Sequence, residues 1–143
     1  MPAERLLACW EKSAAVYRRL VETARAMQRS LVAARHQELD ALAKQAHHLL
    51  DQLQPLEREQ RQLAALLAGG AAGLPAAVEA RLAPERRPRL KAVVAELEQW
   101  SAELKRLGAE NMALAGQGLQ FVDATPDAFR RSASPGYGAA GNV

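Results

Sequence analysis

The first residues to consider are those that could bind a metal ion, and this sequence has few of them. Its three histidines are His36, His47 and His48. His47 precedes Asp51 by four residues, so the two would lie on one face of a helix and could share a metal ion. Two solvated residues explain the same spacing more simply, and a helical di-iron site needs Glu-x-x-His pairs on two helices, which do not occur here. The sequence therefore predicts no metal site.

Residues for covalent or phosphate chemistry are equally scarce. Cys9 is the single cysteine, which excludes an intrachain disulfide and a thiolate metal cluster and favours a reducing compartment. The sequence has no glycine-rich phosphate loop, no Ser/His/Asp set in a recognisable context and no Cys/His spacing for zinc. We therefore expect neither an enzyme nor a cofactor.

A basic cluster around two prolines, Pro84 and Pro88, is the remaining candidate. We call it the basic elbow, and it consists of Arg81, Arg86, Arg87, Arg89 and Lys91. Such a cluster could contact phosphate, but nucleic-acid modules usually add stacking aromatic side chains or a recognition helix. Neither is visible, and the net charge is only +3. We expect no nucleic-acid partner, and a basic nucleic-acid-associated protein stays an alternative that predicts strongly salt-dependent binding.

The elements that must position these residues are predicted by three apolar seams. In each seam, apolar residues recur in steps of three and four, which is typical of helices that pack as coiled coils or bundles. The first seam contains Leu6, Trp10, Ser13, Tyr17, Leu20, Ala24, Met27 and Leu31; the second contains Leu39, Leu42, Ala46, Leu49, Leu53, Leu56, Gln60, Leu63 and Leu67; the third contains Leu90, Val93, Leu97, Trp100, Leu104, Leu107, Asn111, Leu114, Gly118 and Phe121.

These seams predict an all-α fold, an antiparallel bundle of three long coiled-coil-like helices at about 4–34, 37–68 and 86–123. The first two seams are out of phase without a Gly or Pro between them, and we favour a turn near 34–37 over one continuous helix. Gly69 and Gly70 end the second helix, and a short helical turn follows near 75–83. Residues 1–124 are expected to form the helical domain and residues 125–143 a flexible tail.

No segment predicts a membrane span or a signal peptide. The longest uncharged apolar stretch, residues 63–78, is interrupted by three glycines and Pro75, whereas a span needs about 18–20 uninterrupted residues. Glu11 and Lys12 break the first apolar run, so a signal-peptide core is missing. We expect a soluble, cytoplasmic protein without stable membrane insertion.

Two features near the C-terminus suggest contact with another protein. Asn111 and, one heptad later, Gly118 interrupt the third seam, so the end of this helix could be incompletely covered and receive an amphipathic helix; a frayed helix end explains the same pattern. Tyr137 lies in the segment "SPGYGAAG", which has no periodicity and cannot build a core. It is either a chance tail residue or an aromatic anchor that a partner buries.

Four segments, taken in order, resemble the FlgN family of flagellar type III export chaperones. They are "RLVETARAMQRSLVAARHQELDAL" at residues 19–42, "LEREQRQLAALLAGG" with Arg61, "ENMALAGQGLQFV" with the family's Asn-x-x-Leu at Asn111 and Leu114, and "GYGAAG" with the family's Tyr-Gly-x-x-Gly at Tyr137, Gly138 and Gly141. The resemblance covers nearly the whole chain.

The resemblance implies a cytoplasmic helical chaperone without ATPase activity. Such proteins bind the C-terminal helical segments of the hook–filament junction proteins FlgK and FlgL, prevent their premature association and deliver them to the export apparatus, including the gate protein FlhA; the export ATPase complex is a further candidate partner. In this interpretation Tyr137 and Gly138 dock to the export gate. The expected cargo-binding residues are Leu107, Asn111, Leu114, Leu119, Phe121 and Val122.

Two alternatives remain open beside this interpretation. A generic coiled-coil scaffold or oligomerisation module would use the same seams, and it predicts a stable homo-oligomer. Another type III secretion chaperone, or a helical regulator with a similar bundle, would be hard to distinguish by sequence.

Overall fold

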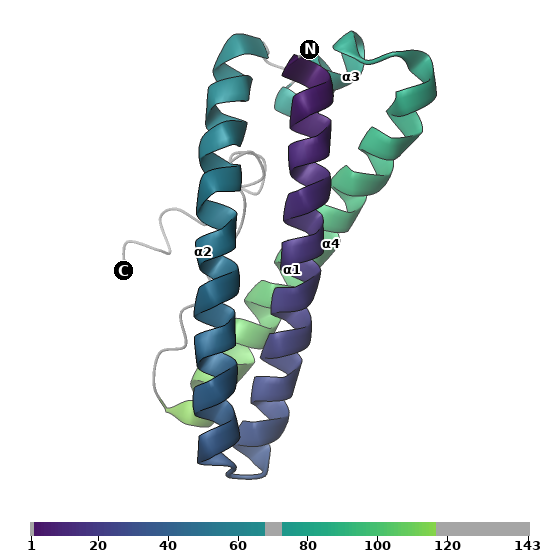
Figure 1. The fold of residues 1–143 in the computed structure, drawn as a ribbon. Coiled ribbons are helices and arrows are strands. Elements are labelled where there is room, and N and C mark those ends of the chain that lie inside the picture. The colour runs from purple at the N-terminus through teal and green to yellow at the C-terminus, as the bar shows by residue number, and fades with distance from the viewer. Residues whose placement is uncertain (1, 68–72, 117–143) are drawn as a thin grey trace, which may run out of the picture.

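The computed structural model describes residues 2–67 and 73–116, and these form helices joined by short connections (Figure 1). The elements are α1 (Pro2–Val32), α2 (His36–Leu67), α3 (Leu74–Arg81), the 3₁₀ helix η1 (Pro84–Arg86) and α4 (Arg87–Ala115). The all-α prediction is confirmed. The prediction of three long helices was incomplete, because the expected turn near 75–83 is a regular fourth helix.

Helix α1 is the central element of the fold. It packs along both α2 and α4, and these two contacts make up most of the tertiary structure in the described residues. Side-chain bonds give the directions. Arg5 contacts Glu59 near one end of the α1–α2 pair and Ser30 contacts Glu38 near the other, so the two helices are antiparallel. Arg89 contacts Glu11 and Glu110 contacts Gln28, so α4 runs in the same sense as α1.

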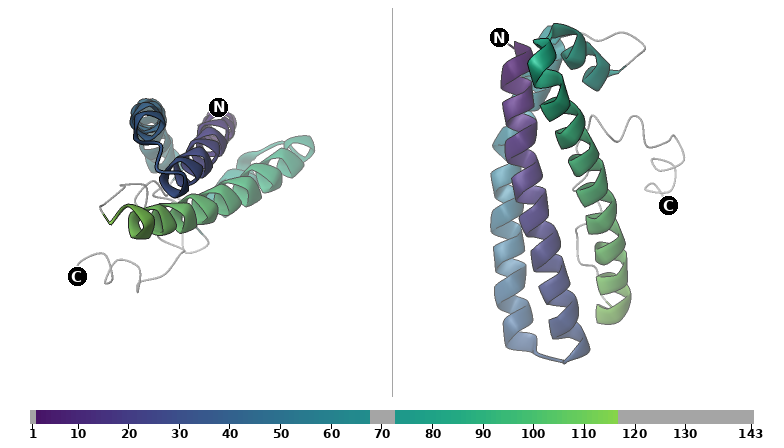
Figure 2. Two further views of the ribbon diagram at one scale, coloured as in Figure 1. Left: turned by 90° about the horizontal axis from the view of Figure 1, so that it is seen from below. Right: turned by 90° about the vertical axis from the view of Figure 1, so that its right-hand side faces the viewer.

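Helix α4 does not follow the α1–α2 pair closely along its whole length. Figures 1 and 2 show that it begins beside α1, away from α2, and crosses the pair at an angle. Helix α3 packs against α1, α2 and α4 at the end where α4 begins, and its Val78 is fully buried there. The short helix therefore covers the core where the long helices spread apart.

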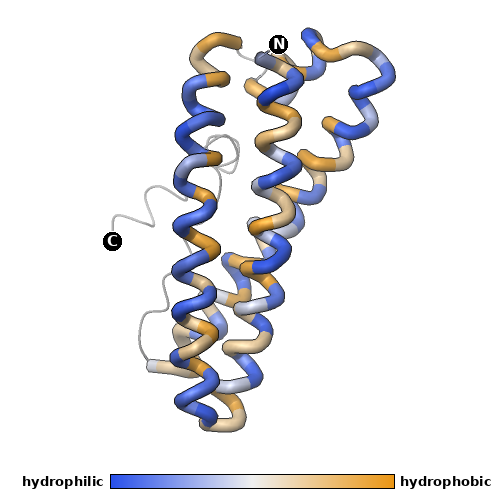
Figure 3. The backbone as a smooth tube through the Cα atoms, viewed as in Figure 1, coloured by the Kyte–Doolittle hydropathy of each residue, from blue (hydrophilic) through white to orange (hydrophobic). Residues whose placement is uncertain are grey.

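The predicted seams face inward. Trp10, Tyr17, Leu49 and Leu97 are among the fully buried side chains, and Figure 3 shows apolar and polar residues alternating along each long helix as an amphipathic pattern requires. Burial of this kind stabilises a helix by about 25 cal/mol for each Å² of apolar surface removed from water. The seams are less well covered at the α1–α2 turn, where Leu39 is only half-buried.

A turn joins α1 to α2, as the phase slip predicted. Arg35 N–H bonds to the Ser30 carbonyl at 2.9 Å, and Ala34 N–H bonds to the Leu31 carbonyl at 3.2 Å. These are the two bonds of a Schellman motif, which requires a left-handed residue just after the helix. Ala34 fills this position at a φ of 56°. Because the residue is Ala and not Gly, the sequence carried no visible stop signal.

Helix α2 continues through Pro55, which lies inside it. Proline removes the backbone N–H that would bond the carbonyl of Asp51, four residues earlier. Both Pro55 and Asp51 are exposed, so water can solvate this carbonyl and the missing bond is tolerated.

Helix α4 ends earlier than predicted, at Ala115 and not near residue 123. Gly116 follows in the left-handed conformation at a φ of 62°. Glycine adopts this conformation without steric cost, and it commonly closes helices in this way. The prediction that the apolar seam would carry the helix past this glycine was therefore wrong. The predicted tail at 125–143 lies outside the described residues.

Candidate functional site

The predicted cargo-binding residues divide into three groups. Leu107 and Asn111 are buried, and Leu114, one turn further along α4, is 52 % exposed. Leu119, Phe121 and Val122 lie outside the described residues, as do the predicted gate-docking residues Tyr137 and Gly138. Of the six residues predicted to bind cargo, only Leu114 therefore presents a surface in the described part of the chain.

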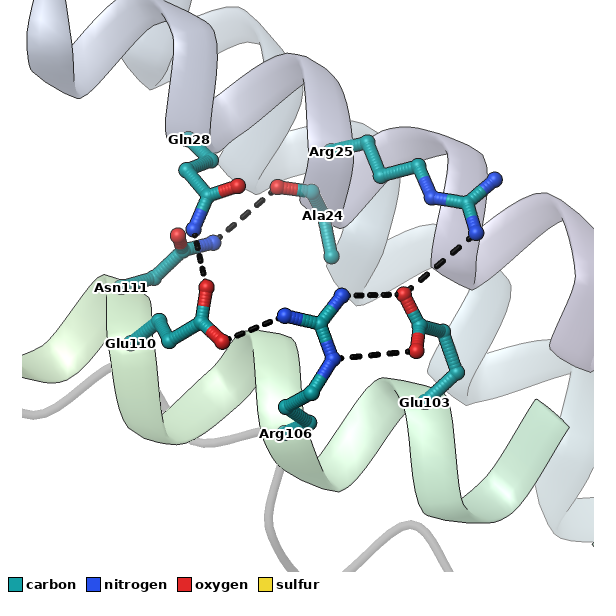
Figure 4. Close-up of polar contacts among 7 residues, drawn as sticks. All are labelled: Ala24, Arg25, Gln28, Glu103, Arg106, Glu110 and Asn111. Atoms are coloured by element: carbon teal, nitrogen blue, oxygen red, sulfur yellow. Dashed lines mark hydrogen bonds and ion pairs between the residues drawn. The ribbon is translucent and has the colours of Figure 1, made fainter. Parts of the chain in front are cut away.

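Asn111 forms a hydrogen bond that links the end of α4 to α1. Its Nδ2 donates a hydrogen bond of 3.0 Å to the backbone carbonyl of Ala24, and its side chain is fully buried (Figure 4). Its Oδ1 has no hydrogen-bond partner among the described residues. An unsatisfied buried acceptor costs about 1–3 kcal/mol. Asn111 therefore fixes the register of the two helices at a cost in stability, as a polar residue in an apolar seam does.

Beside Asn111, polar side chains of α1 and α4 form a strip that we call the polar edge (Figure 4). Gln28 Nε2 donates to Glu110 Oε1 at 2.8 Å, and Arg25 Nη2 lies 3.4 Å from Glu103 Oε1. Arg106 lies between the two carboxylates, with its Nε 3.1 Å from Glu103 Oε2 and its Nη1 bonded to Glu110. The polar edge consists of Arg25, Gln28, Glu103, Arg106 and Glu110.

The pairing on the polar edge changes the acidity of its carboxyl groups. The hydrogen bond from Arg106 is the main cause that lowers the pKa of Glu103. The hydrogen bond from Gln28 is the main cause that lowers the pKa of Glu110, with Arg106 adding to it. The two carboxylates in turn raise the pKa of Arg106. The edge is therefore charged at neutral pH, and its charges compensate one another.

Exposed apolar side chains lie next to the polar edge, toward the C-terminal ends of α1 and α4. Leu114 lies one helical turn beyond Glu110, and Val32 lies one turn beyond Gln28 and is 73 % exposed. Met112 of the same turn of α4 is also partly exposed. Scattered exposed apolar residues are ordinary on protein surfaces. Here three of the four large exposed hydrophobic residues of the described chain lie at one end of the molecule, which makes this end the candidate binding surface.

A shallow hollow lies on a second side of α1, between α1 and α2 near the turn. Its volume is about 410 Å³, and none of the predicted binding residues lines it. The hollow is lined by Ala26, Arg29, Ser30, Arg35, Glu38, Ala41 and Leu42.

The basic elbow is largely engaged within the chain itself. Arg86 lies 3.4 Å from Glu4, and Arg89 Nη2 lies 2.6 Å from Glu11 Oε1, which raises the pKa of Arg89. Arg81 donates to the carbonyl of Ala77 in its own helix. These contacts attach the start of α4 to α1 and reduce the charge that is free for phosphate.

Of the other residues considered for chemistry, His47 and Asp51 are both exposed on α2. His48 and Gln52 approach each other at 3.1 Å on the exposed face of α2. Cys9 is buried, its Sγ lies 3.3 Å from the Leu56 carbonyl, and burial raises the pKa of its thiol. Residues 2–67 and 73–116 contain no group of three or more His, Cys, Asp or Glu side chains placed to hold a metal ion.

Sequence reasoning missed the polar edge, although part of its signal was present. Glu103, Arg106 and Glu110 follow one another at spacings of three and four, which is the spacing of ion pairs on one helix. The contacts of Arg25 and Gln28 with α4 join residues about 80 positions apart, so helical spacing could not reveal them.

Comparison with known proteins gives one match. A family model described as FlgN, FlgN protein, matches residues 1–143, the whole chain. No curated protein and no solved structure matches at a significant level. In the described part of the chain, every helix is too short or too polar to cross a membrane.

Proposed function

The chain belongs to the FlgN family of flagellar export chaperones, and from that premise we propose that it binds the hook–filament junction proteins FlgK and FlgL in the cytoplasm. It shields their C-terminal helical segments from premature association and delivers them to the export apparatus. A subunit awaiting export exposes an apolar helix face that would otherwise aggregate. A helical protein with an incompletely covered apolar end can bind such a face reversibly.

The observation that carries this proposal is the exposure of Leu114. It occupies a seam position, where Leu90, Leu97 and Leu104 are buried, yet it is 52 % exposed. The residues that would extend the surface beyond it are Leu119, Phe121 and Val122. In the proposal these residues and Leu114 contact the cargo directly, whereas Leu107 and Asn111 hold α4 in position.

The experiment compares two exposed leucines at opposite ends of the molecule. Leu114→Ser removes the apolar side chain at the end of α4, and Leu66→Ser is the matched control, because Leu66 is 68 % exposed near the end of α2. Affinities for purified FlgK and FlgL are measured by titration calorimetry. We expect Leu114→Ser to weaken binding by about tenfold, the effect of losing one buried leucine contact, and Leu66→Ser to leave it unchanged.

Equal effects of the two substitutions would place the cargo elsewhere. Absence of binding by the unaltered chain would remove the proposed cargo altogether and favour a scaffold, for which light scattering should then detect a stable homo-oligomer.

The tail is proposed to act at a later step, at the export gate. A chain ending at residue 124 should retain FlgK and FlgL but lose binding to the cytoplasmic part of FlhA, and Tyr137→Ala should reproduce this loss alone. A rigid aromatic side chain offers a large contact area at low entropic cost, which suits a recognition element. Normal export of the junction proteins by a Tyr137→Ala strain would contradict a role for Tyr137.

A further inference from the structure

We infer that the face of α1 beneath the last two turns of α4 is a second binding surface for the cargo, and that a cargo helix takes the place of residues 108–115 on it. This inference rests on the proposed function and extends it. The cargo would then contact the part of α1 that residues 108–115 cover in the free chain, in addition to Leu114 on the detached segment.

The first support is a change in the residues that α4 turns toward α1. Up to Leu107 the buried positions are leucines, a valine and one serine, Ser101, and beyond it they are Gly108 and Asn111, with Ala115 half-buried. Small and polar residues bury little apolar surface, so they contribute little to holding two helices together. The end of α4 is therefore held less firmly than its beginning.

The second support is the nature of the contacts that do hold this end. The polar edge is largely exposed, and solvent weakens ion pairs of this kind. Asn111 donates one hydrogen bond to Ala24 but leaves its Oδ1 unsatisfied in the described chain. When α4 leaves α1, water can solvate this oxygen, so part of the cost of detachment is recovered.

The third support is what detachment would uncover. Ala24, whose carbonyl accepts the hydrogen bond from Asn111, is fully buried, and Leu31, two turns further along the apolar seam of α1, is half-buried. This spacing presents a stripe into which an amphipathic helix can pack. The structure already has one helix seated on it in the same direction as α1. The partner we infer is an amphipathic helix of the cargo with a small residue at the place of Gly108 and an apolar one at the place of Asn111.

Asn111→Leu tests this inference in the full chain. Leucine extends the apolar seam and leaves no buried acceptor unsatisfied, so it should fasten α4 to α1. Gln99→Leu is the matched control, because it makes a similar change on the exposed face of α4. Amide hydrogen exchange measures detachment, and calorimetric titration with purified FlgK and FlgL measures cargo binding.

In the unaltered chain we expect amides of residues 109–115 to exchange at least tenfold faster than those of residues 94–104. Asn111→Leu should slow exchange at 109–115 about tenfold and weaken cargo binding about fivefold or more, and Gln99→Leu should change neither. Equal protection of both segments in the unaltered chain would overturn the inference, as would cargo binding by Asn111→Leu at the original affinity. If the unaltered chain binds neither protein, the proposed function fails as well, so the two failures are distinguishable.

Discussion

Helix α1 has two long neighbours, and the two contacts satisfy their buried polar groups differently. On the α2 side, Gln60 Nε2 donates to Ser13 Oγ at 2.8 Å, so a buried side chain of each helix provides the other's partner. On the α4 side, Asn111 bonds to the backbone of Ala24 and its Oδ1 has no partner in the described chain. Both polar residues fix register, but only the contact with α2 does so without an unsatisfied acceptor.

The inferred detachment of the end of α4 requires this difference, since α2 must stay on α1 while the end of α4 leaves it. The α1–α2 contact combines leucine seams with a satisfied polar pair. The end of the α1–α4 contact combines small residues, exposed charges and an asparagine whose Oδ1 has no hydrogen-bond partner in the described chain. Three measurements would break or sharpen this comparison.

The largest expected difference in stability is between substitutions in the middle of α4 and substitutions at its end. Leu97→Ala removes a fully buried side chain and should lower the free energy of unfolding by about 2–5 kcal/mol. Leu114→Ala removes a half-exposed side chain and should change the free energy of unfolding by less than about 0.5 kcal/mol. Urea denaturation of both variants gives the values. Similar losses for the two would mean that the end of α4 is as well packed as its middle.

A smaller difference in stability is expected between substitutions of the two buried amide side chains, Gln60 and Asn111. Gln60→Leu leaves the buried Ser13 hydroxyl without its donor and should lower the free energy of unfolding by about 1–3 kcal/mol. Asn111→Leu should keep or raise stability, because the Ala24 carbonyl retains the hydrogen bond of its own helix. Denaturation midpoints show whether each variant is less or more stable than the unaltered chain. If both variants are destabilised, the α1–α2 and α1–α4 contacts do not differ in this respect.

The smallest effect concerns the charges of the polar edge. The pKa values of Glu103 and Glu110 are lowered in the folded chain from an ordinary value of 4.5. A lowered folded pKa contributes stability above the unfolded pKa, and this contribution is lost as pH falls through the folded value. Acidification below about pH 4.5 should therefore loosen the end of α4.

Arg106→Gln should raise both pKa values, which carboxyl NMR titration measures directly. Arg18→Gln is the control, since Arg18 pairs with Glu22 elsewhere on α1. Unchanged pKa values in Arg106→Gln would assign the shift to another cause.

The helices themselves could be predicted from the sequence because their periodicity is a local property. Leu49 and Leu97 are buried as the seams indicated, and Asn111 is buried where a polar residue interrupts its seam. The turn near residue 34 was detectable as a phase slip. The function was indicated by the order of several weak motifs, and the family match confirmed the family.

What could not be predicted depends on contacts between distant residues or on backbone conformation. The seams do not say which side of α1 receives α2 and which receives α4, so they could not distinguish the buried Leu107 and Asn111 from the exposed Leu114. The left-handed conformation of Ala34 has no sequence signature, because alanine rarely adopts it. The end of α4 before Gly116 could not be predicted from the seam, because its three-and-four spacing continues past this glycine.

The tight turn at Ala34 also has a consequence for the order in which the chain assembles. Contacts across it join residues close in sequence, such as Ser30 with Glu38, eight positions apart, whereas Asn111 and Ala24 are 87 positions apart. Closing the longer loop costs about 2 kcal/mol more in chain entropy. The α1–α2 hairpin can therefore form while the chain is still being synthesised, and α4 docks afterwards onto a finished surface. The last element to arrive is also the one whose end is most weakly held.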